Sequence, residues 1–484
     1  MSDVASPASS DVGARVSTIR LATIAAPQLR LDAKHYQEDF LKARARVVAS
    51  GFPVRLVRDV AGAAVPGRTK LVTVSNATAG AGYLEAHEAF LLRPETGRYV
   101  ARAATPDYES YLLRPGMILT PSSGRNLGPL AYVGKNLAGF AMTDIIRLAP
   151  FVPDDGLYLL AYLLTPTGQA LLRRGRTGTT VDHLSANDAG DIPVAWVDRE
   201  ARSKIVDRMR KAEGALDAGR LALDEAELEL HSLLGLPPQP TPGKYLAAAG
   251  ARAFSMRTAD LSLRLDVAYY DPQVRECRRQ ISERGGGRLA AAAELVMLGR
   301  YKRYYVPAGH GLPIMSGRQT LQMRPVNLQY ISGRSFSDPG AFVLGRGWST
   351  FTCDGRAEEG LGSPGFVFVT RTGWMASNHV MRAIPRSGVH PGYLYLALRS
   401  RYVQIQLKAA ATGSVIDALD PAAAGDVVIP RLSGADERRL GAIAATAWDG
   451  IGRAIRLEDA VVRALDAMIT NAYESPRHEA MVAH

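Results

Sequence analysis

The sequence predicts a mixed α+β protein with two tandem globular domains, separated and followed by long helices that form an antiparallel coiled coil. Three observations predict this fold class: a long internal repeat, short strand-like segments within it, and a heptad-like apolar pattern that closes each copy. A chain of 484 residues is long enough for roughly two to four domains, each with its own core.

The repeat consists of four blocks that occur twice, in the same order and about 235 residues apart. A period of this length indicates duplication of a domain-sized unit, because solenoid repeats are much shorter. The segments between the blocks differ more than the blocks do, which suggests two related sites that recognise different things. The paired blocks are residues 29–36 and 263–270, 156–161 and 392–397, 177–184 and 412–419, and 190–191 and 425–426.

Each copy begins with a globular part in which strands and helices are mixed. In the first copy, residues 53–57, 70–74 and 117–120 are β-branched or alternating segments bounded by Gly or Pro, which predicts strands. Residues 157–173 have the apolar period of a helix, and Pro166 is expected to break or kink it.

Each copy closes with a predicted long helix, in which apolar or small residues recur in alternating steps of four and three. This pattern is typical of a helix that packs along another helix. Gly219 weakens the first helix, and Glu458 interrupts the second stripe. A helix of about 30 residues is roughly 45 Å long. We expect the stripes to bury each other; alternatively, each helix packs on its own domain. The stripes are Ile205, Met209, Ala212, Leu216, Gly219, Leu223, Ala226, Leu230 and Leu233, and Leu440, Ala444, Ala447, Ile451, Ala454, Val461, Leu465 and Met468.

These patterns set the expected domain boundaries. Four prolines between residues 237 and 242 indicate a stiff linker, and the Ser- and Ala-rich start indicates disorder. We expect a disordered lead-in at 1–20, a first globular domain at 21–197, a central helix at 198–236, a Pro-rich linker at 237–250, a second globular domain at 251–431, a C-terminal helix at 432–473 and a tail at 474–484.

Composition narrows the class of protein. The net charge of +11 favours a polyanionic partner, with nucleic acid ahead of an anionic membrane. Two cysteines, Cys277 and Cys353, are too few for a disulfide framework or a four-ligand zinc site, so we expect buried free thiols. No apolar run approaches the roughly 20 residues that span a bilayer, and no signal-peptide pattern opens the sequence. We therefore expect a cytoplasmic protein with no membrane partner.

The most specific motifs lie at the ends of the two globular parts. The first is Thr177-Gly178-Thr179-Thr180-Val181-Asp182-His183-Leu184, which leads into Asp191-Ile192-Pro193-Val194. The second is Thr412-Gly413-Ser414-Val415-Ile416-Asp417-Ala418-Leu419, which leads into Val427-Val428-Ile429-Pro430. Residues 116–120 and 365–373 are each typical of a strand entering a polar, glycine-containing loop. With these motifs and this order of domains and helices, the chain resembles the specificity subunit of type I restriction–modification systems from about Leu29 to Tyr473.

The resemblance implies a subunit without catalytic activity of its own, whose two target recognition domains each read half of a split, asymmetric site in double-stranded DNA. The antiparallel helices would fix the spacer between the half-sites. They would also dock two methyltransferase subunits, which carry S-adenosylmethionine, and through them a restriction (translocase) subunit. One feature departs from the family: residues 198–202 and 434–438 stand where many members have a Pro-rich stretch and a Glu-Gln pair. A specificity factor of another phage-defence system is therefore an alternative.

Candidate DNA contacts lie in polar loops of both copies. Side chains with paired donors and acceptors read base edges, whereas cations hold phosphates. The loop at 121–126 ends in an Arg–Asn pair suited to guanine and adenine, and residues 300–305 alternate cations with tyrosines. Each loop could instead be an ordinary surface or packed segment. The Thr-Gly blocks more simply serve the scaffold, with Gly178 and Gly413 forming turns. The predicted DNA contacts are Arg68, Lys70, Ser122, Ser123, Arg125, Asn126, Lys135, Lys302, Arg303, Tyr304, Arg318, Gln319, Arg371, Thr372 and Asn378.

One glycine motif leaves an enzymatic alternative open. Residues 71–74 lead into Ala79-Gly80-Ala81-Gly82, which is typical of a strand entering the glycine loop of a nucleotide or S-adenosylmethionine site. An amino-methyltransferase also needs an Asn/Asp-Pro-Pro-aromatic motif, and the only Pro-Pro is Pro237-Pro238 in the linker. We therefore expect no catalytic residues, cofactor or metal. The alternatives are a self-sufficient DNA methyltransferase and a coiled-coil scaffold for protein partners.

Overall fold

The computed structural model describes residues 33–474, apart from residues 69, 95, 125–126, 179, 241–253, 262–263, 336–337, 356–359 and 414–415. The predicted lead-in, most of the linker and nearly all of the tail lie outside these residues. Within them, no helix is long and apolar enough to cross a membrane.

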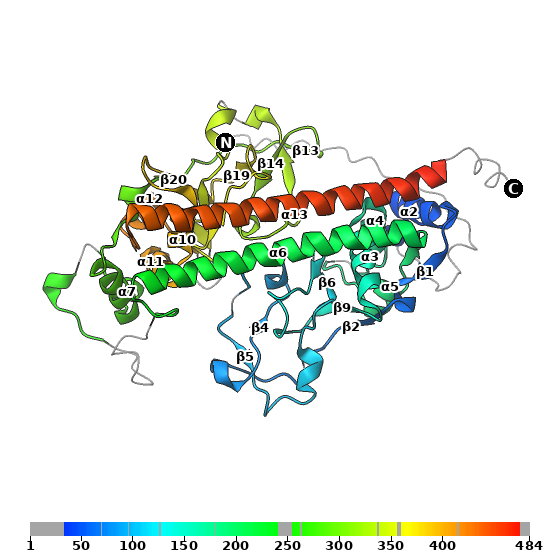
Figure 1. The fold of residues 1–484 in the computed structure, drawn as a ribbon, viewed down its shortest axis with the longest axis horizontal. Helices are drawn as coiled ribbons and strands as arrows, with labels where there is room; N and C mark the ends of the chain where they lie inside the picture. The colour runs from blue at the N-terminus through cyan, green and yellow to red at the C-terminus, as the bar shows by residue number, and fades with distance from the viewer. Residues whose placement is uncertain are drawn as a thin grey trace, which may run out of the picture.

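Two long helices, α6 (Arg199–Leu233) and α13 (Gly434–Glu474), lie side by side along the length of the molecule (Figure 1). Arg439 near the start of α13 pairs with Glu229 near the end of α6 at 2.8 Å, and Ile451 faces Gly219 farther along. Since residues earlier in one helix meet residues later in the other, the helices are antiparallel. At 35 and 41 residues, they are roughly 50 to 60 Å long.

The helix ends are explained by local sequence. The Asp198 side chain accepts a hydrogen bond from the Ala201 backbone N–H and caps α6. Ser433 does the same for Asp436 at the start of α13. Gly235, with a φ of +62°, follows the end of α6 in a left-handed conformation that favours glycine. The observed bounds thus lie close to the predicted helical segments.

The globular part of each copy contains mixed helices and short strands. In the first copy the helices are α2 (Glu38–Ala49), α3 (Pro153–Leu164), α4 (Pro166–Arg174) and α5 (Ala186–Gly190). Its strands are β1 (Val54–Leu56), β2 (Ala61–Ala64), β3 (Thr73–Val74), β4 (Tyr83–Leu84), β5 (Tyr99–Val100), β6 (Ile118–Pro121), β7 (Ala131–Tyr132), β8 (Ala141–Met142), β9 (Ile145–Pro150) and β10 (Pro193–Ala195).

The second copy follows the same plan. Its helices are α7 (Pro272–Ser282), α8 (Leu289–Ala292), α9 (Gly317–Thr320), α10 (Pro391–Arg399), α11 (Arg401–Ala410) and α12 (Pro421–Gly425). Its strands are β11 (Gly287–Arg288), β12 (Ala293–Val296), β13 (Tyr305–Val306), β14 (Leu312–Met315), β15 (Gln329–Ile331), β16 (Ser349–Thr352), β17 (Asp354–Gly355), β18 (Pro364–Phe366), β19 (Met375–Ala376), β20 (Val380–Pro385), β21 (Asp417–Ala418) and β22 (Val428–Ile429).

The strands pair in the same way in both copies. An antiparallel four-stranded sheet has the order β2-β9-β6-β7 in the first copy and β12-β20-β16-β18 in the second. The parallel pair β4–β8 corresponds to β14–β19, and the antiparallel pair β1–β10 corresponds to β11–β22. The sequence repeat is therefore matched by a repeated strand topology.

The globular parts pack against opposite ends of the helix pair, and Figure 1 shows their sheets on opposite sides of it. Leu160 of α3 shares one apolar core with Met209 of α6 and Leu465 of α13. The other end is centred on Trp448 of α13, whose ring stacks on Phe368 with centroids 4.9 Å apart. Each long helix therefore contributes to both cores.

Several local predictions can be compared with the structure. Pro166 does separate two helices, α3 and α4. The apolar stripes are buried, except that Met468 is only partly buried and Leu233 is 45% exposed. The prediction for Leu233 was wrong, because α6 ends there and Leu234 is buried instead. Of the strand predicted at 70–74, only Thr73–Val74 forms. Arg318 and Gln319, predicted to lie in a polar loop, belong to the short helix α9.

Candidate nucleic-acid interface

In the first copy, predicted contact residues gather around Asp144, in the turn between β8 and β9. The Arg68 guanidinium pairs with the Asp144 carboxylate and, at 3.2 Å, with Glu85. The Ser122 hydroxyl donates to the Asp144 carbonyl oxygen at 2.7 Å, and Arg98 pairs with Glu85 at 2.7 Å. Partial burial would raise the pKa of Glu85, but the Arg98 hydrogen bond and the Arg68 charge outweigh it and hold that pKa below its ordinary value. The cluster therefore places two arginines between two carboxylates.

In the second copy, a comparable cluster surrounds Asn378. Arg303 donates from Nη2 to the Asn378 side-chain oxygen at 2.7 Å, and its guanidinium lies 5.3 Å from the Tyr301 ring centroid. His379 follows Asn378, and its Nδ1 hydrogen-bonds Asp354 in β17. The ring packing leaves Arg303 half-buried with a fixed orientation, which suits a directional contact.

The two clusters occupy equivalent places in the repeat. Arg68 and Arg303 are about 235 residues apart, as are Asp144 and His379. In each copy an arginine from the segment after the edge strand, β2 or β12, reaches the turn that leads into the inner strand, β9 or β20. We call this place in each copy the corner: it comprises Arg68 and Asp144 in the first copy and Arg303 and Asn378 in the second. The two corners are equivalent in the scaffold but carry different side chains.

In each copy, a buried arginine in the inner strand stabilises the corner through hydrogen bonds to backbone carbonyls. Arg147 in β9 donates to the carbonyls of Tyr111, at 2.7 Å, and Met142, at 2.6 Å. Arg382, its equivalent in β20, donates to the Ala376 carbonyl at 3.1 Å. Burial lowers the pKa of both guanidinium groups to about 10, which still leaves them charged at neutral pH. They tie the inner strand to the preceding loop and so fix the turn that carries each cluster.

The two Thr-Gly blocks form tight hairpins beside the clusters. Thr177 exchanges backbone hydrogen bonds with His183, and Thr412 does so with Ala418. Gly178 has a φ of +106°, and a Cβ there would lie 2.2 Å from the Val181 carbonyl oxygen. The turn role predicted for the glycines is confirmed, because a side chain would collide with the opposite strand of the hairpin.

The other candidates separate into exposed and structural residues. Lys70, Ser123, Lys302, Tyr304 and Thr372 are exposed, and the Lys302 ammonium lies 5.1 Å from the Tyr304 ring centroid. Lys135 is exposed beside α6, and its backbone N–H donates a hydrogen bond to the Asp217 carboxylate of that helix. Arg318 is exposed on α9, while Gln319 is occupied in the cap of that helix and donates to the Val326 carbonyl at 2.7 Å. Arg125 and Asn126 lie outside the described residues.

Arg371 was predicted to contact DNA, but the structure places it in the interior of the second copy. The side chain is 2% exposed, and its guanidinium donates to the carbonyls of Thr320, at 2.9 Å, and Gln322. Burial lowers its pKa to about 10. A base or phosphate cannot reach a guanidinium in this position, so Arg371 is a structural residue that supports the segment after α9.

The sequence interpretation missed Glu85, Arg98, Asp144 and Asp354. No local motif marks them, because they become neighbours only through strand pairing across the sheet. Alignment of the two copies at the repeat spacing sets Arg68 against Arg303, and it would have singled out this corner.

The glycine motif that suggested a cofactor has a packing explanation. A Cβ at Gly80 would lie 2.1 Å from the Val100 carbonyl oxygen, and one at Gly82 would lie 2.8 Å from the Phe140 ring. The three-residue turn Ala77–Ala79 precedes Gly80, and β4 follows Gly82 without a helix whose N-terminus could hold a phosphate. Among the residues that the structure describes, no group of three or more His, Cys, Asp or Glu could hold a metal ion. Cys277 and Cys353 are buried free thiols, as predicted.

No protein-family model matches the chain, and neither does any curated protein. Among solved structures, it is similar to a type I restriction-modification system S subunit from M. genitalium, with 11% identity over 87% of this chain and 96% of that one and a TM-score of 0.35. It is also similar to the HsdS subunit from Thermoanaerobacter tengcongensis, with 15% identity over 88% and 97% of the two chains and a TM-score of 0.26. These neighbours are S subunits.

A third similar structure comes from work on complex assembly and conformational transition of the type I R-M system. It has 16% identity over 87% of this chain and 97% of the other, with a TM-score of 0.26. The family that the sequence motifs resemble is thus also the family of these structure neighbours.

Proposed function

We propose that this chain is the DNA-specificity subunit of a type I restriction–modification system, and that it has no catalytic activity of its own. Its two globular parts act as tandem target recognition domains, each reading one half of a split DNA site. The single observation that carries the proposal is the repeated corner: Arg68 with Asp144, and Arg303 with Asn378, lie at equivalent places in two copies of one scaffold.

Chemical differences between the corners support two different half-sites. Arg68 is oriented by carboxylates, whereas Arg303 is oriented by an amide and a tyrosine ring. An arginine held in this way can donate two hydrogen bonds to one guanine edge, and Asn378 can donate to and accept from adenine. The surrounding cations, including Lys70 and Lys302, suit the phosphate backbone. Two related corners with different side chains would thus recognise an asymmetric, bipartite sequence.

The helix pair serves as the spacer element of the proposal. Two antiparallel helices that share both apolar cores hold the globular parts at a set separation, as expected of a coiled coil. We propose that the helices also dock the methyltransferase subunits, which bind the restriction subunit and work with this chain in the cytoplasm. Leu221 and Leu228 of α6 lie seven residues apart and are each 50% exposed, so they form a short apolar stripe along one face of that helix.

Selection from a randomised DNA library tests the proposal directly. The purified chain, alone and with a candidate type I methyltransferase subunit, is incubated with random duplexes, and the bound DNA is sequenced. We expect two short fixed blocks separated by a constant number of unspecified base pairs. Arg303→Ala should relax one block and leave the other intact, whereas Arg58→Ala, which removes an exposed arginine paired with Asp191, serves as the control. Enrichment of no sequence, or of a single contiguous block, would contradict the proposal.

The partner surface has a separate test. Leu221→Asp with Leu228→Asp should weaken co-purification of the methyltransferase while DNA selection by the chain is retained. Unchanged co-purification would exclude this stripe as the docking surface. Methylation of DNA by the chain alone would argue for a self-sufficient methyltransferase instead.

A further inference from the structure

The two globular parts touch each other directly at the centre of the molecule. Leu92 donates its backbone N–H to the Leu321 carbonyl at 2.9 Å, and Met323 donates to the Phe90 carbonyl at 3.2 Å. Leu91 and Gln322 form an antiparallel bridge between these hydrogen bonds. Leu91 and Gln322 are equivalent positions of the repeat, so the contact has a local two-fold axis. We name residues 90–94 and 321–325 the crossing segments.

Each crossing segment carries an arginine that reaches a buried carboxylate on a long helix. Arg93 pairs with Glu227 of α6 at 2.8 Å, and Arg324 pairs with Glu458 of α13 at 2.9 Å. The two glutamate side chains are 5% and 4% exposed. Arg324 also pairs with Asp459 at 2.8 Å. The arginines, like the glutamates, are about 230 residues apart, so the same clamp occurs twice.

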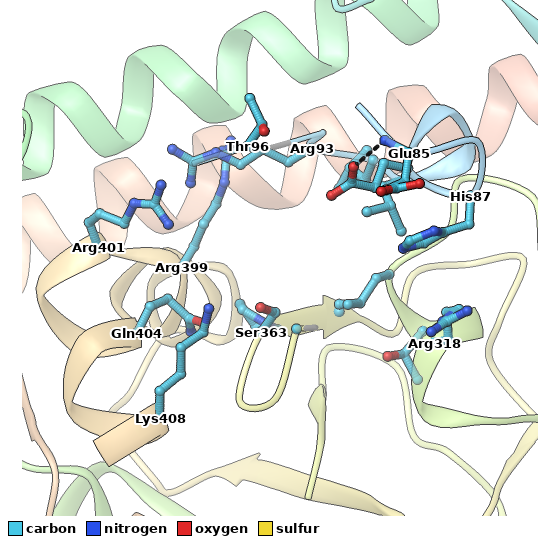
Figure 2. A pocket seen from close by; sticks show the side chains of 18 of the residues that line it. Glu85, His87, Arg93, Thr96, Arg318, Ser363, Arg399, Arg401, Gln404 and Lys408 are labelled. Atoms are coloured by element: carbon cyan, nitrogen blue, oxygen red, sulfur yellow. Dashed lines mark hydrogen bonds between the residues drawn. The ribbon is translucent and has the colours of Figure 1, made fainter. Parts of the chain in front are cut away.

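The clamps connect the copies as well as the crossing segments. Arg399, at the end of α10 in the second copy, also approaches Glu227 at 3.4 Å and pairs with Asp224. Arginines from both globular parts thus share one carboxylate. Figure 2 shows Arg93 and Arg399 meeting at one edge of a cavity of about 570 Å³ that is lined by both copies. Buried Arg371 supports the second crossing segment by donating a hydrogen bond to the Gln322 carbonyl.

A helix pair by itself fixes the distance between two domains better than it fixes the angle between them. Each globular part is packed at one end of the pair. A small rotation of that part about the helix axis would therefore displace its corner, and the DNA contacts proposed there, by a large distance. The crossing contact holds the first part at a second point, because Leu92 packs against the core of the second part, away from the core that α3 shares with the helix pair. Two separated points of attachment prevent the rotation.

We infer that the crossing segments, with the clamps Arg93–Glu227 and Arg324–Glu458, fix the angle between the two globular parts and thereby select the spacer length between the half-sites. The inference about spacer length rests on the proposed function, whereas the inference about the angle does not. Arg93 and Arg324 are positioning residues, since their side chains contact the helix pair and not the clusters around Arg68 and Arg303.

Binding measurements on a set of spacers test the first consequence. Duplexes carry the selected half-sites with spacers from two base pairs shorter to two longer than the preferred length. We expect the unmodified chain to prefer one length by at least about tenfold, and Arg93→Met with Arg324→Met to reduce this preference several-fold. Discrimination against a changed base within either half-site should stay the same. The control is Arg210→Met, which removes an exposed ion pair with Asp154 inside the first copy. An undiminished spacer preference in the double variant would overturn the inference.

A distance measurement without DNA separates the inference from the proposed function. Spin labels are attached at Ala103→Cys and His310→Cys, two exposed positions in different globular parts, and the distribution of distances between them is recorded. We expect a narrow distribution that broadens in the double methionine variant but not with Arg210→Met. If the double methionine variant does not fold, Arg93→Lys with Arg324→Lys is used in its place. It keeps both charges but loses the forked geometry of arginine, and it should broaden the distance distribution less than the methionines would. An unchanged distribution would refute the clamps, whereas absence of any split-site preference would refute only the proposed function.

Discussion

Gly219, at the centre of the helix pair, allows a worked prediction about how closely α6 and α13 approach. A Cβ at this position would lie 2.6 Å from Cγ1 of Ile451 and 3.2 Å from the Ala447 carbonyl oxygen. Ile451 is fully buried, and its β-branched side chain has little freedom to turn away. Alanine is favoured over glycine in a helix by about 1 kcal/mol, whereas overpacking a close contact costs about 1 to 3 kcal/mol. Gly219→Ala should therefore be neutral or destabilising by up to about 2 kcal/mol.

Gly214 provides a matched control in the same helix. It is exposed, and a Cβ there would meet nothing within 4 Å, so Gly214→Ala should stabilise α6 by about 1 kcal/mol. Chemical denaturation followed by the helical circular dichroism signal should separate the two variants by about 1 to 3 kcal/mol. Equal stabilisation by both alanines would show that the helices are not in close contact at Gly219, and the packing argument would fail.

Three further predictions concern the buried interior. Arg371→Met should destabilise the chain by about 2 to 4 kcal/mol, measured by chemical denaturation, because it leaves buried carbonyls without a donor. Burial and the neighbouring Glu458 raise the pKa of Glu213 to about 8, so folding favours its protonated form and stability should fall as the pH rises from about 5 through 8. Glu213→Gln should flatten this pH dependence of the melting temperature, and an unchanged slope would contradict the raised pKa. Trp448→Ala should cost about 3 to 5 kcal/mol, with a lower melting temperature as the readout, because it removes a buried side chain that stacks on Phe368 and leaves a cavity in the core.

The sequence predicted those parts of the fold that depend on local patterns. The stripe from Ile205 to Leu230 is buried as its spacing indicates, because one face of a regular helix is set by periodicity alone. Pro166 separates two helices, since proline lacks the N–H that would continue the first. The repeat in sequence corresponds to a repeat in strand order. These features depend on neighbours within a few residues or on simple duplication.

The candidate site was predictable only in part, because burial of a polar side chain depends on distant segments. Arg371 and Arg303 both stand in polar segments rich in candidate contacts, and the sequence does not distinguish them. Arg371 is enclosed by carbonyls about 50 residues away, whereas Arg303 lies half-buried against Asn378 at a corner. In the sequence, Glu458 only interrupts an apolar stripe, whereas in the structure it is the buried partner of Arg324. Tertiary pairing, which no local pattern encodes, decides each case.

The different charges of the two corners carry a consequence for the proposed function. In the first corner, Arg68 and Arg98 are matched by Asp144 and Glu85, so the corner presents little net charge to a phosphate. Such a corner gains little from non-specific attraction, because the carboxylates repel the DNA backbone. It can bind well only where a base edge offers acceptors that replace those carboxylates as partners of the arginines. If the chain reads DNA as proposed, this corner would combine specificity with a low affinity for random DNA.

The second corner has the opposite balance. Arg303 is oriented by a neutral amide, and Lys302 is exposed two residues before the exposed ring of Tyr304. Its attraction to phosphate is not cancelled locally, so this half should supply more of the salt-dependent affinity. If the second corner supplies most of the affinity for phosphate and the first supplies sequence discrimination, the chain can stay bound to DNA through the second corner while the first tests successive sequences. Because rigid coupling would place the first corner at a fixed distance from the held segment, the clamps and the charge difference would act together in recognising a split site.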